Sequence, residues 1–347
     1  MLTAFADETM MRGLRYLALA CALSLVTTSA FAGKPGGKAS GPIEARDKAL
    51  LAFQRDLVSV LAPRADALPL LGAALLARPL TNQPKYNTFH SLIERAAQAD
   101  DTDAAVSWVR LVDCDAKADA CPNTAALEKL ATQAPDNAAV WLLKLSADAR
   151  NLKQDAARED LAKAAAAKRY DDYTGTSLQA LASSVGVLPP PADTLDPASA
   201  AGAAGMQAML VYGVAVTQPQ PGLQVTAKLC EKAGNDASIK ADCLKLGKTL
   251  EWGSSPLARS LGLHLREVLA EDPAQRDDAR RARLNLIWQV QNFAQLSGRV
   301  HGDKALAQHL LALARRGGTE MSLLLAALRD NSIPADAPAD WTPQHAE

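Results

Sequence analysis

The chain has 347 residues, of which 48% are hydrophobic and 22% are charged, and its formal net charge is −1. This is the composition of a globular protein, and the small net charge argues against a general binder of nucleic acid or anionic membranes, which needs an excess of basic residues. Aromatic residues make up only 4% of the chain, whereas alanine and leucine are abundant. Because alanine and leucine lose little side-chain freedom in helices, we expect an all-α fold and no nucleic-acid partner.

Residues 1–32 predict a secretory signal peptide. Its three parts are a positively charged stretch with Arg12 and Arg15, an apolar stretch over residues 16–26, and the small-residue motif Ala30-Phe31-Ala32. We expect cleavage after Ala32, which would leave a periplasmic or secreted mature chain without a stable membrane insertion.

The start of this segment leaves alternatives. Asp7 and Glu8 are unusual ahead of a signal peptide, so we expect translation to begin at Met10 or Met11. A lipid anchor on Cys21, or an uncleaved helix that holds the protein at the membrane, would also be compatible with the apolar stretch. The apolar run continues past Cys21, which favours cleavage.

Cleavage would remove Cys21 and leave four cysteines, Cys114, Cys121, Cys230 and Cys243. An even number of cysteines in an exported chain predicts disulfides, and the spacing pairs them locally as Cys114–Cys121 and Cys230–Cys243. Free thiols or a metal site are the alternatives. Because the histidines are scattered and no Cys-x-x-Cys occurs, we favour structural disulfides and expect no metal or other cofactor.

The first predicted domain covers residues 43–187 and follows a flexible leader, residues 33–42, that is rich in Gly, Lys, Ser and Pro. Apolar residues recur at intervals of three and four over 43–62, which predicts a helix that Pro63 ends. More short helices follow at similar spacing, and Thr88 is placed to accept a hydrogen bond as the N-cap of one of them.

One unit of this domain resembles a tetratricopeptide repeat. The residues that carry the resemblance are Pro135, Asn137, Trp141, Ala157, Leu161 and Ala164. In that family two antiparallel helices pack through small residues at the positions of Ala157 and Ala164, with a large residue at Leu161 between them. The resemblance implies an α-solenoid of stacked antiparallel helix hairpins, which exposes a concave binding surface.

Residues 188–197 contain Pro189-Pro190-Pro191 and Pro197 and predict an extended, semi-rigid linker. A second domain, a helical bundle over residues 198–332, would follow. Its helices are predicted to begin at Ser255-Pro256 and Asp272-Pro273 and to stop at Gly317-Gly318. The Pro-rich tail, 333–347, is expected either to be disordered or to lie extended with Trp341 in a groove.

The uncharged stretch at residues 198–216 is long enough to be compared with a membrane span. Gln207 and Tyr212 interrupt it, and no basic residues flank it. We therefore expect a central helix that packs through its small residues, and keep a membrane helix as the alternative.

The loop with the most functional appearance contains Tyr170, Asp172 and Tyr173. Exposed tyrosines between charges of both signs are typical of recognition surfaces, so the loop is a candidate partner-binding site. In the alternative interpretation Tyr170 packs beneath the preceding helix and Asp172 caps the next one.

No motif for nucleophilic, phosphate-binding or zinc chemistry occurs in the sequence. Histidines His264, His301 and His309 lack metal-ligand spacing, and the arginines of residues 276–283 lie beside Asp277 and Asp278, a mixture of signs that favours a solvated helix face over an anion-binding site. We therefore expect an exported, periplasmic helical scaffold that binds a protein or peptide partner in the cell envelope, and not an enzyme. The alternatives are an envelope enzyme without a linear motif, acting on cell-wall material, and a membrane-anchored helical protein.

Overall fold

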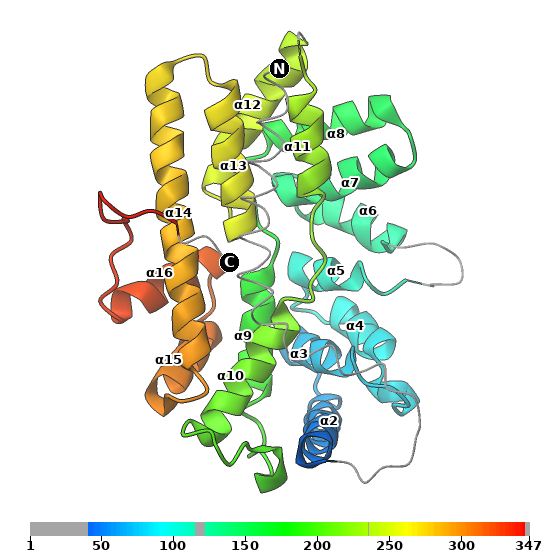
Figure 1. Ribbon diagram of the computed structural model, residues 1–347. Helices are drawn as coiled ribbons and strands as arrows, with labels where there is room; N and C mark the ends of the chain where they lie inside the picture. Colours follow the sequence, from blue (N-terminus) through cyan, green and yellow to red (C-terminus); the bar gives the residue numbers. More distant parts are fainter. Residues whose placement is uncertain (1–40, 115–121, 235, 344–347) are drawn as a thin grey trace.

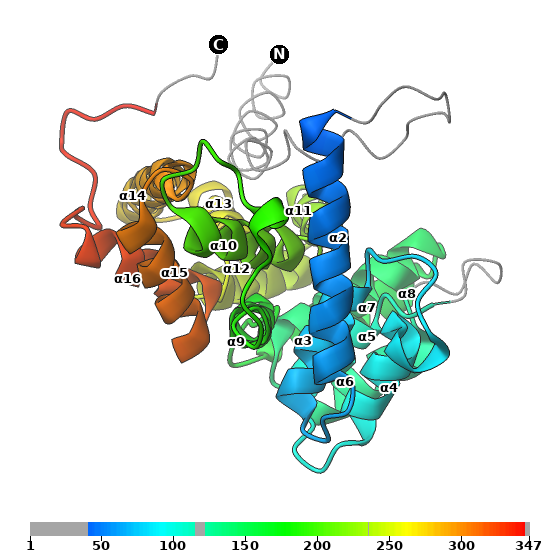
Figure 2. The same cartoon turned by 90° about the horizontal axis from the view of Figure 1, so that it is seen from below.

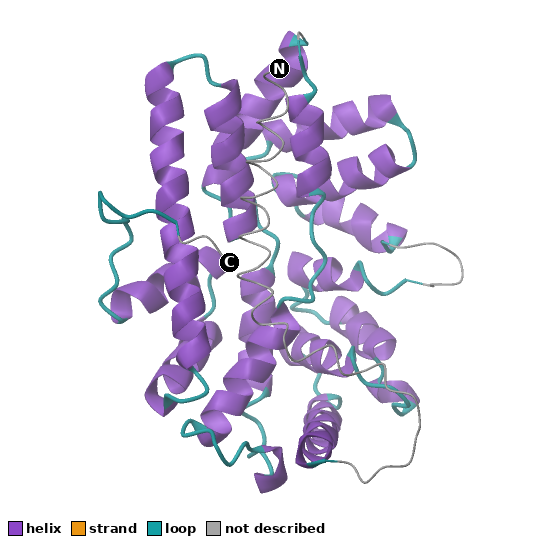
Figure 3. Cartoon of the chain, viewed as in Figure 1, coloured by secondary structure: helices purple, strands orange, loops and turns teal. Residues whose placement is uncertain are grey.

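The computed structural model describes residues 41–114, 122–234 and 236–343. Across these residues the fold is all-α, with fifteen α-helices, two 3-10 helices and no strand, as the sequence predicts (Figures 1 and 3). The predicted signal peptide, most of the leader, Cys121 and the last four residues of the tail lie outside the described residues, so the Cys114–Cys121 prediction is not tested.

The helices are short, with one exception. Their bounds are α2 Pro42–Leu61, α3 Ala67–Ala77, α4 Phe89–Gln98, α5 Ala104–Arg110, α6 Thr124–Gln133, α7 Ala138–Arg150, α8 Gln154–Ala166, α9 Thr174–Ser184, α10 Gly202–Ala215, α11 Leu223–Glu231, α12 Ala237–Glu251, α13 Pro256–Leu269, α14 Pro273–Arg299, α15 Lys304–Arg316 and α16 Glu320–Asp330, with the 3-10 helices η1 Lys85–Asn87 and η2 Ala192–Thr194. The exception is α14, whose 27 residues give a length of about 40 Å.

Polar side chains fix where many of these helices begin. The caps that accept a main-chain N–H of the first turn are Thr88, Asp103, Asn123, Asn137, Asp236, Asp272, Asp303 and Thr319. Each satisfies a donor that the helix itself leaves unpaired. Pro256 and Pro273 open α13 and α14 as predicted, and α15 ends before Gly317 and Gly318, which both adopt positive φ. The turn chemistry of the sequence is therefore a reliable guide to helix boundaries here.

The buried side chains form two hydrophobic clusters. The first gathers residues of α2, α3, α4, α5, α9, α10, α13, α14, α15 and α16, and the second gathers residues of α5, α6, α7, α8, α11, α12 and α13, so α5 and α13 belong to both. Both clusters therefore draw on helices from either side of residues 188–197. The predicted division at this segment does not separate two cores, and the segment itself packs η2 against α2, where Arg46 pairs with Asp196 at 2.9 Å.

The path of the chain explains this sharing. Helices α3 to α8 rise along one side of the molecule, α9 and α10 run through its middle, and α12 to α14 lie on the opposite side (Figure 1). Viewed from below, α2 crosses in front of this arrangement and α15 and α16 close its far side (Figure 2). The hairpin α7–α8 contacts α12, which in turn packs on α13 and α13 on α14, so these five helices follow one another as neighbours.

Helix α10, which lies within the uncharged stretch, packs against α9 and α15 through residues that include Ala204, Gly205, Ala208 and Val211. This is the packing through small residues that the sequence predicts. None of the helices in the described part of the chain is long and apolar enough to cross a membrane.

A disulfide joins α11 to α12. Cys230 and Cys243 are both buried, with their Cα atoms 5.7 Å apart, as predicted from their local spacing. The bridge closes a short loop and limits the freedom of the unfolded chain. A buried disulfide is compatible with a protein outside the reducing cytoplasm.

Two glycines allow α12 and α13 to approach each other closely. A Cβ atom added to Gly262 would lie 2.7 Å from the carbonyl oxygen of Gly247, which is closer than real Cβ atoms approach backbone. The two helices can therefore keep their present distance only while Gly262 carries no side chain, whereas a Cβ atom at Gly247 would lie 3.2 Å from the Gly262 carbonyl oxygen, a tight contact that a small shift relieves.

We expect Gly262→Ala to lower the free energy of unfolding by about 1–3 kcal/mol, because the added methyl group must push two backbones apart. Gly298→Ala is the matched control, since a Cβ at Gly298 in α14 meets no atom within 4 Å. Alanine there should stabilise the helix by about 0.5–1 kcal/mol. Urea unfolding followed by circular dichroism measures both changes, and equal stability of the two variants would contradict the close-contact argument.

Candidate functional site

Three loops meet where the two hydrophobic clusters adjoin. The main-chain N–H of Ser254, between α12 and α13, donates to the carbonyl of Tyr170 at 3.1 Å, and the Ser254 carbonyl accepts from Met321 N–H at 2.9 Å. The third loop reaches the first at Gly175, where a Cβ atom would collide with the carbonyl of Gly318. We call these loops, residues 167–175, 252–255 and 317–321, the three-loop junction.

The predicted recognition residues lie inside this junction. Tyr170, Asp172 and Tyr173 are 4%, 2% and 7% exposed, so the exposure on which the partner-binding prediction depended is absent. The physical reason is that Tyr170 packs in the second hydrophobic cluster while Asp172 Oδ1 accepts from Ser254 Oγ at 3.2 Å and from Thr174 N–H at 3.3 Å. The buried Tyr170 agrees with the alternative interpretation, in which the loop packs; the N-cap of α9 is Tyr173, which makes no side-chain cap hydrogen bond, so Asp172 is not the N-cap residue.

Asn137 holds the same loop from the other side. Its Nδ2 donates to the Asp171 carbonyl at 2.7 Å and to Tyr173 Oη at 3.2 Å, while its Oδ1 accepts from Asp171 N–H at 2.9 Å. The Tyr173 ring lies 5.6 Å from that of Trp108. Asn137, one of the residues that resemble a tetratricopeptide repeat, therefore anchors the junction as well as capping α7.

The junction also holds a carboxyl group that the sequence analysis missed. Glu320, half-buried at the first turn of α16, has its pKa raised from about 4.5 to about 8 by burial and by the nearby Asp172 carboxylate. Glutamate in a first helical turn normally complements the helix dipole in solvent, so the sequence offers no signal for its burial. At neutral pH this carboxyl group is protonated, which removes the repulsion from Asp172.

The free energy of unfolding should fall as the pH rises from 5 to 9. Glu320 has a higher pKa folded than unfolded, so the folded state holds a proton that the unfolded state releases, and this contribution is lost as the pH passes through the folded pKa. We expect wild type to lose on the order of 2 kcal/mol more than Glu320→Gln between pH 6 and pH 9.

Denaturant unfolding at several pH values gives this difference. Glu128→Gln, a change at an exposed carboxylate on α6, is the control and should leave the slope unchanged. Parallel slopes for wild type and Glu320→Gln would show that the burial of this carboxyl group is without consequence.

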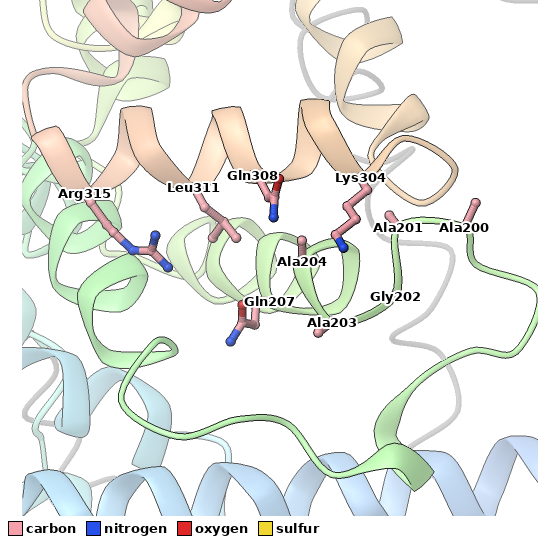
Figure 4. Close-up of a pocket in the computed structure, with 10 residues that line it drawn as sticks. All are labelled: Ala200, Ala201, Gly202, Ala203, Ala204, Gln207, Lys304, Gln308, Leu311 and Arg315. Atoms are coloured by element: carbon pink, nitrogen blue, oxygen red, sulfur yellow. The ribbon is translucent and has the colours of Figure 1, made fainter.

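A cavity of about 450 Å³ lies between the N-terminal part of α10 and α15, away from the junction (Figure 4). We call it the α10–α15 pocket. Its lining residues are Ala200, Ala201, Gly202, Ala203, Ala204, Gln207, Lys304, Gln308, Leu311 and Arg315. The small residues come from the start of α10 and leave the space open, and every larger side chain except Gln207 comes from α15.

The α15 side chains lie on one face of the helix. Lys304, Gln308, Leu311 and Arg315 follow each other at intervals of three or four residues, and Figure 4 shows all of them directed toward α10, with the two cations at opposite ends. The pocket is thus an elongated groove with a positive group at each end and amides between.

The electrostatics of the groove favour an anion. None of its ten lining residues is acidic. Lys304 is exposed and makes no hydrogen bond or ion pair with the described residues, whereas Arg315 donates from Nε to the Ala182 carbonyl at 3.0 Å. Helix α10 begins without a side-chain cap, so its first turn adds the positive end of a helix dipole to the same groove.

The three histidines considered as metal ligands each contact a carboxylate. His264 lies 3.1 Å from Glu231, His301 3.6 Å from Asp196, and His309 3.2 Å from Asp330, each as a histidine–carboxylate contact. In the part of the chain that the structure describes, no group of three or more His, Cys, Asp or Glu residues is arranged to hold a metal.

Two of the four arginines in residues 276–283 of α14 pair with acidic neighbours, as on a solvated helix face. Arg280 contacts Asp277 at 2.8 Å and Glu267 at 3.2 Å, and Arg283 contacts the same Glu267 at 3.1 Å. The other two arginines of this stretch, Arg276 and Arg281, are exposed and make no ion pair with the described residues.

Comparison with known proteins adds no relative: no family model, no curated protein and no solved structure matches the chain.

Proposed function

We propose that the protein is an exported helical scaffold that binds a protein partner in the cell envelope, and that the α10–α15 pocket receives an acidic segment of this partner. The observation that carries the proposal is the charge of the pocket: two cations, two amides and the N-terminal turn of α10 line it, and none of its lining residues is acidic. Export is supported by the signal-like residues 1–32 and by the Cys230–Cys243 disulfide.

The dimensions of the groove favour a chain segment over a small free ion. Lys304 and Arg315 are eleven residues apart on α15, which corresponds to about 16 Å along the helix axis. An extended peptide rises about 3.3 Å per residue, so the groove has the length of about five residues. A peptide with carboxylates spaced along it would place one near Lys304 and another near Arg315.

The contacts available in the groove are those of binding and positioning. Gln308 offers a side-chain amide to a peptide main chain, and Leu311 supplies an apolar contact between the two charged ends. The tetratricopeptide-like hairpin α7–α8 and the helices stacked on it would form the rigid support that such a scaffold needs.

The proposal is tested by photocrosslinking in cells, with a photoreactive residue in place of Gln308 and identification of the adducts by mass spectrometry. We expect a recurrent adduct whose crosslinked peptide is acidic. In the same background Lys304→Glu should lower its yield about tenfold, because a like charge replaces the unpaired cation.

The matched control is Lys245→Glu, which makes the same charge change at an exposed position of α12 away from the pocket. Retention of the adduct in Lys245→Glu and its loss in Lys304→Glu would support the proposal. Equal yields in the two variants, or no adduct at all, would overturn it.

A further inference from the structure

The C-terminal tail is held on the surface of α14 by side chains that bind its main chain. Trp288 Nε1 donates to the Pro334 carbonyl at 2.8 Å, and Gln289 Nε2 donates to the Ala335 carbonyl at 2.9 Å. Asn285 also binds the tail, since its Oδ1 accepts a hydrogen bond from Ala337 N–H at 3.1 Å.

The same surface receives an aromatic side chain. The ring of Trp341 lies 5.3 Å from that of Trp288 in an edge-to-face arrangement, with 79° between the ring planes. This is a favourable geometry for two aromatic rings. The tail therefore lies with its tryptophan against the molecule, as in one of the two alternatives that the sequence leaves open.

Most of these contacts do not depend on the sequence of the tail. Three of them go to main-chain groups, and one, from Asn285 Nδ2 to Asp336 Oδ1 at 2.7 Å, goes to a side chain. Main-chain hydrogen bonds combined with a place for one aromatic ring are a general way to bind a peptide. Prolines at 334 and 338 restrict the backbone and reduce the entropy lost on binding, and a turn follows Pro338, where its carbonyl accepts from Trp341 N–H at 3.0 Å.

The tail is held loosely. No residue from 334 to 343 is buried, so its position depends on a few partly exposed hydrogen bonds and one ring contact. The tail stays on the surface of α14 because the covalent link to α16 holds it near that surface at a high effective concentration. Leu284, one turn before Trp288 on the same face of α14, remains 36% exposed and is free for a further apolar contact.

We infer that the surface formed by Leu284, Asn285, Trp288 and Gln289 is a docking site for a proline-rich segment of a partner protein that carries an aromatic residue, and that the tail competes for this site in cis. The inference does not depend on the α10–α15 pocket, which lies on other elements and has a different chemistry.

The test measures binding of a fluorescent peptide with the sequence of residues 333–343 to the full-length chain by fluorescence anisotropy. Wild type should bind it weakly, because its own tail occupies the surface. Trp341→Ala loosens the tail and should bind the peptide at least about tenfold more tightly. Adding Trp288→Ala to that variant should remove binding, and so should adding Asn285→Ala, a smaller change at a partly buried side chain.

Two controls make the outcome decisive. A peptide with alanine in place of its tryptophan should bind weakly to every variant, and circular dichroism should show that each variant is folded. The inference is overturned if Trp341→Ala gains no affinity, or if binding persists in both Trp288→Ala and Asn285→Ala. Self-association of wild type that is lost in Trp341→Ala would assign the site to the tail of a second copy and would overturn the assignment to a partner protein.

Discussion

The hydrogen bonds of Ser254 connect loops that belong to the two hydrophobic clusters. One main-chain group binds the loop before α9 and another binds the start of α16, while the Ser254 hydroxyl binds Asp172. The first of these partners follows the hairpin α7–α8 of the second cluster, and α16 belongs to the first cluster. Besides this junction, helices α5 and α13 connect the two hydrophobic clusters, because each of them contributes side chains to both.

Burial explains why the junction contains such polar residues. Loops carry main-chain groups that need partners, and a loop in the interior must find them among its neighbours. Asp172, Asn137 and Ser254 supply these partners, and the raised pKa of Glu320 keeps a second carboxyl group uncharged beside Asp172 at neutral pH. The polar residues of this region are therefore part of the support of the fold, and the surfaces suited to binding lie elsewhere.

Local features of the fold could be predicted from the sequence, and the long-range ones could not. Caps such as Thr88 and Asp103, the proline starts of α13 and α14, and the glycine stop after α15 act within a few residues, so the sequence pattern identifies them. The Cys230–Cys243 pair was equally local. The loop at Tyr170 was predicted to be exposed because its partners, Ser254 and the start of α16, are more than eighty residues away in the chain.

The same reason explains why the candidate binding surfaces were missed. The α10–α15 pocket combines a stretch of alanine and glycine with one lysine and one arginine that lie about a hundred residues further along the chain. Neither part has a distinctive pattern alone. Trp341 was recognised as a residue that could lie in a groove, but nothing in the local sequence pointed to Trp288 as its neighbour.

The sharing of both clusters between early and late helices has a consequence for the order of folding. Helices α2, α3 and α4 pack on one another and on α9, but the cluster to which they belong is complete only when α15 and α16 are also present. A core assembled from such distant segments folds slowly compared with one built from neighbours. The first core therefore stays incomplete until the last helices are in place, and a chain exported before that point would still be in a form that can be threaded across a membrane.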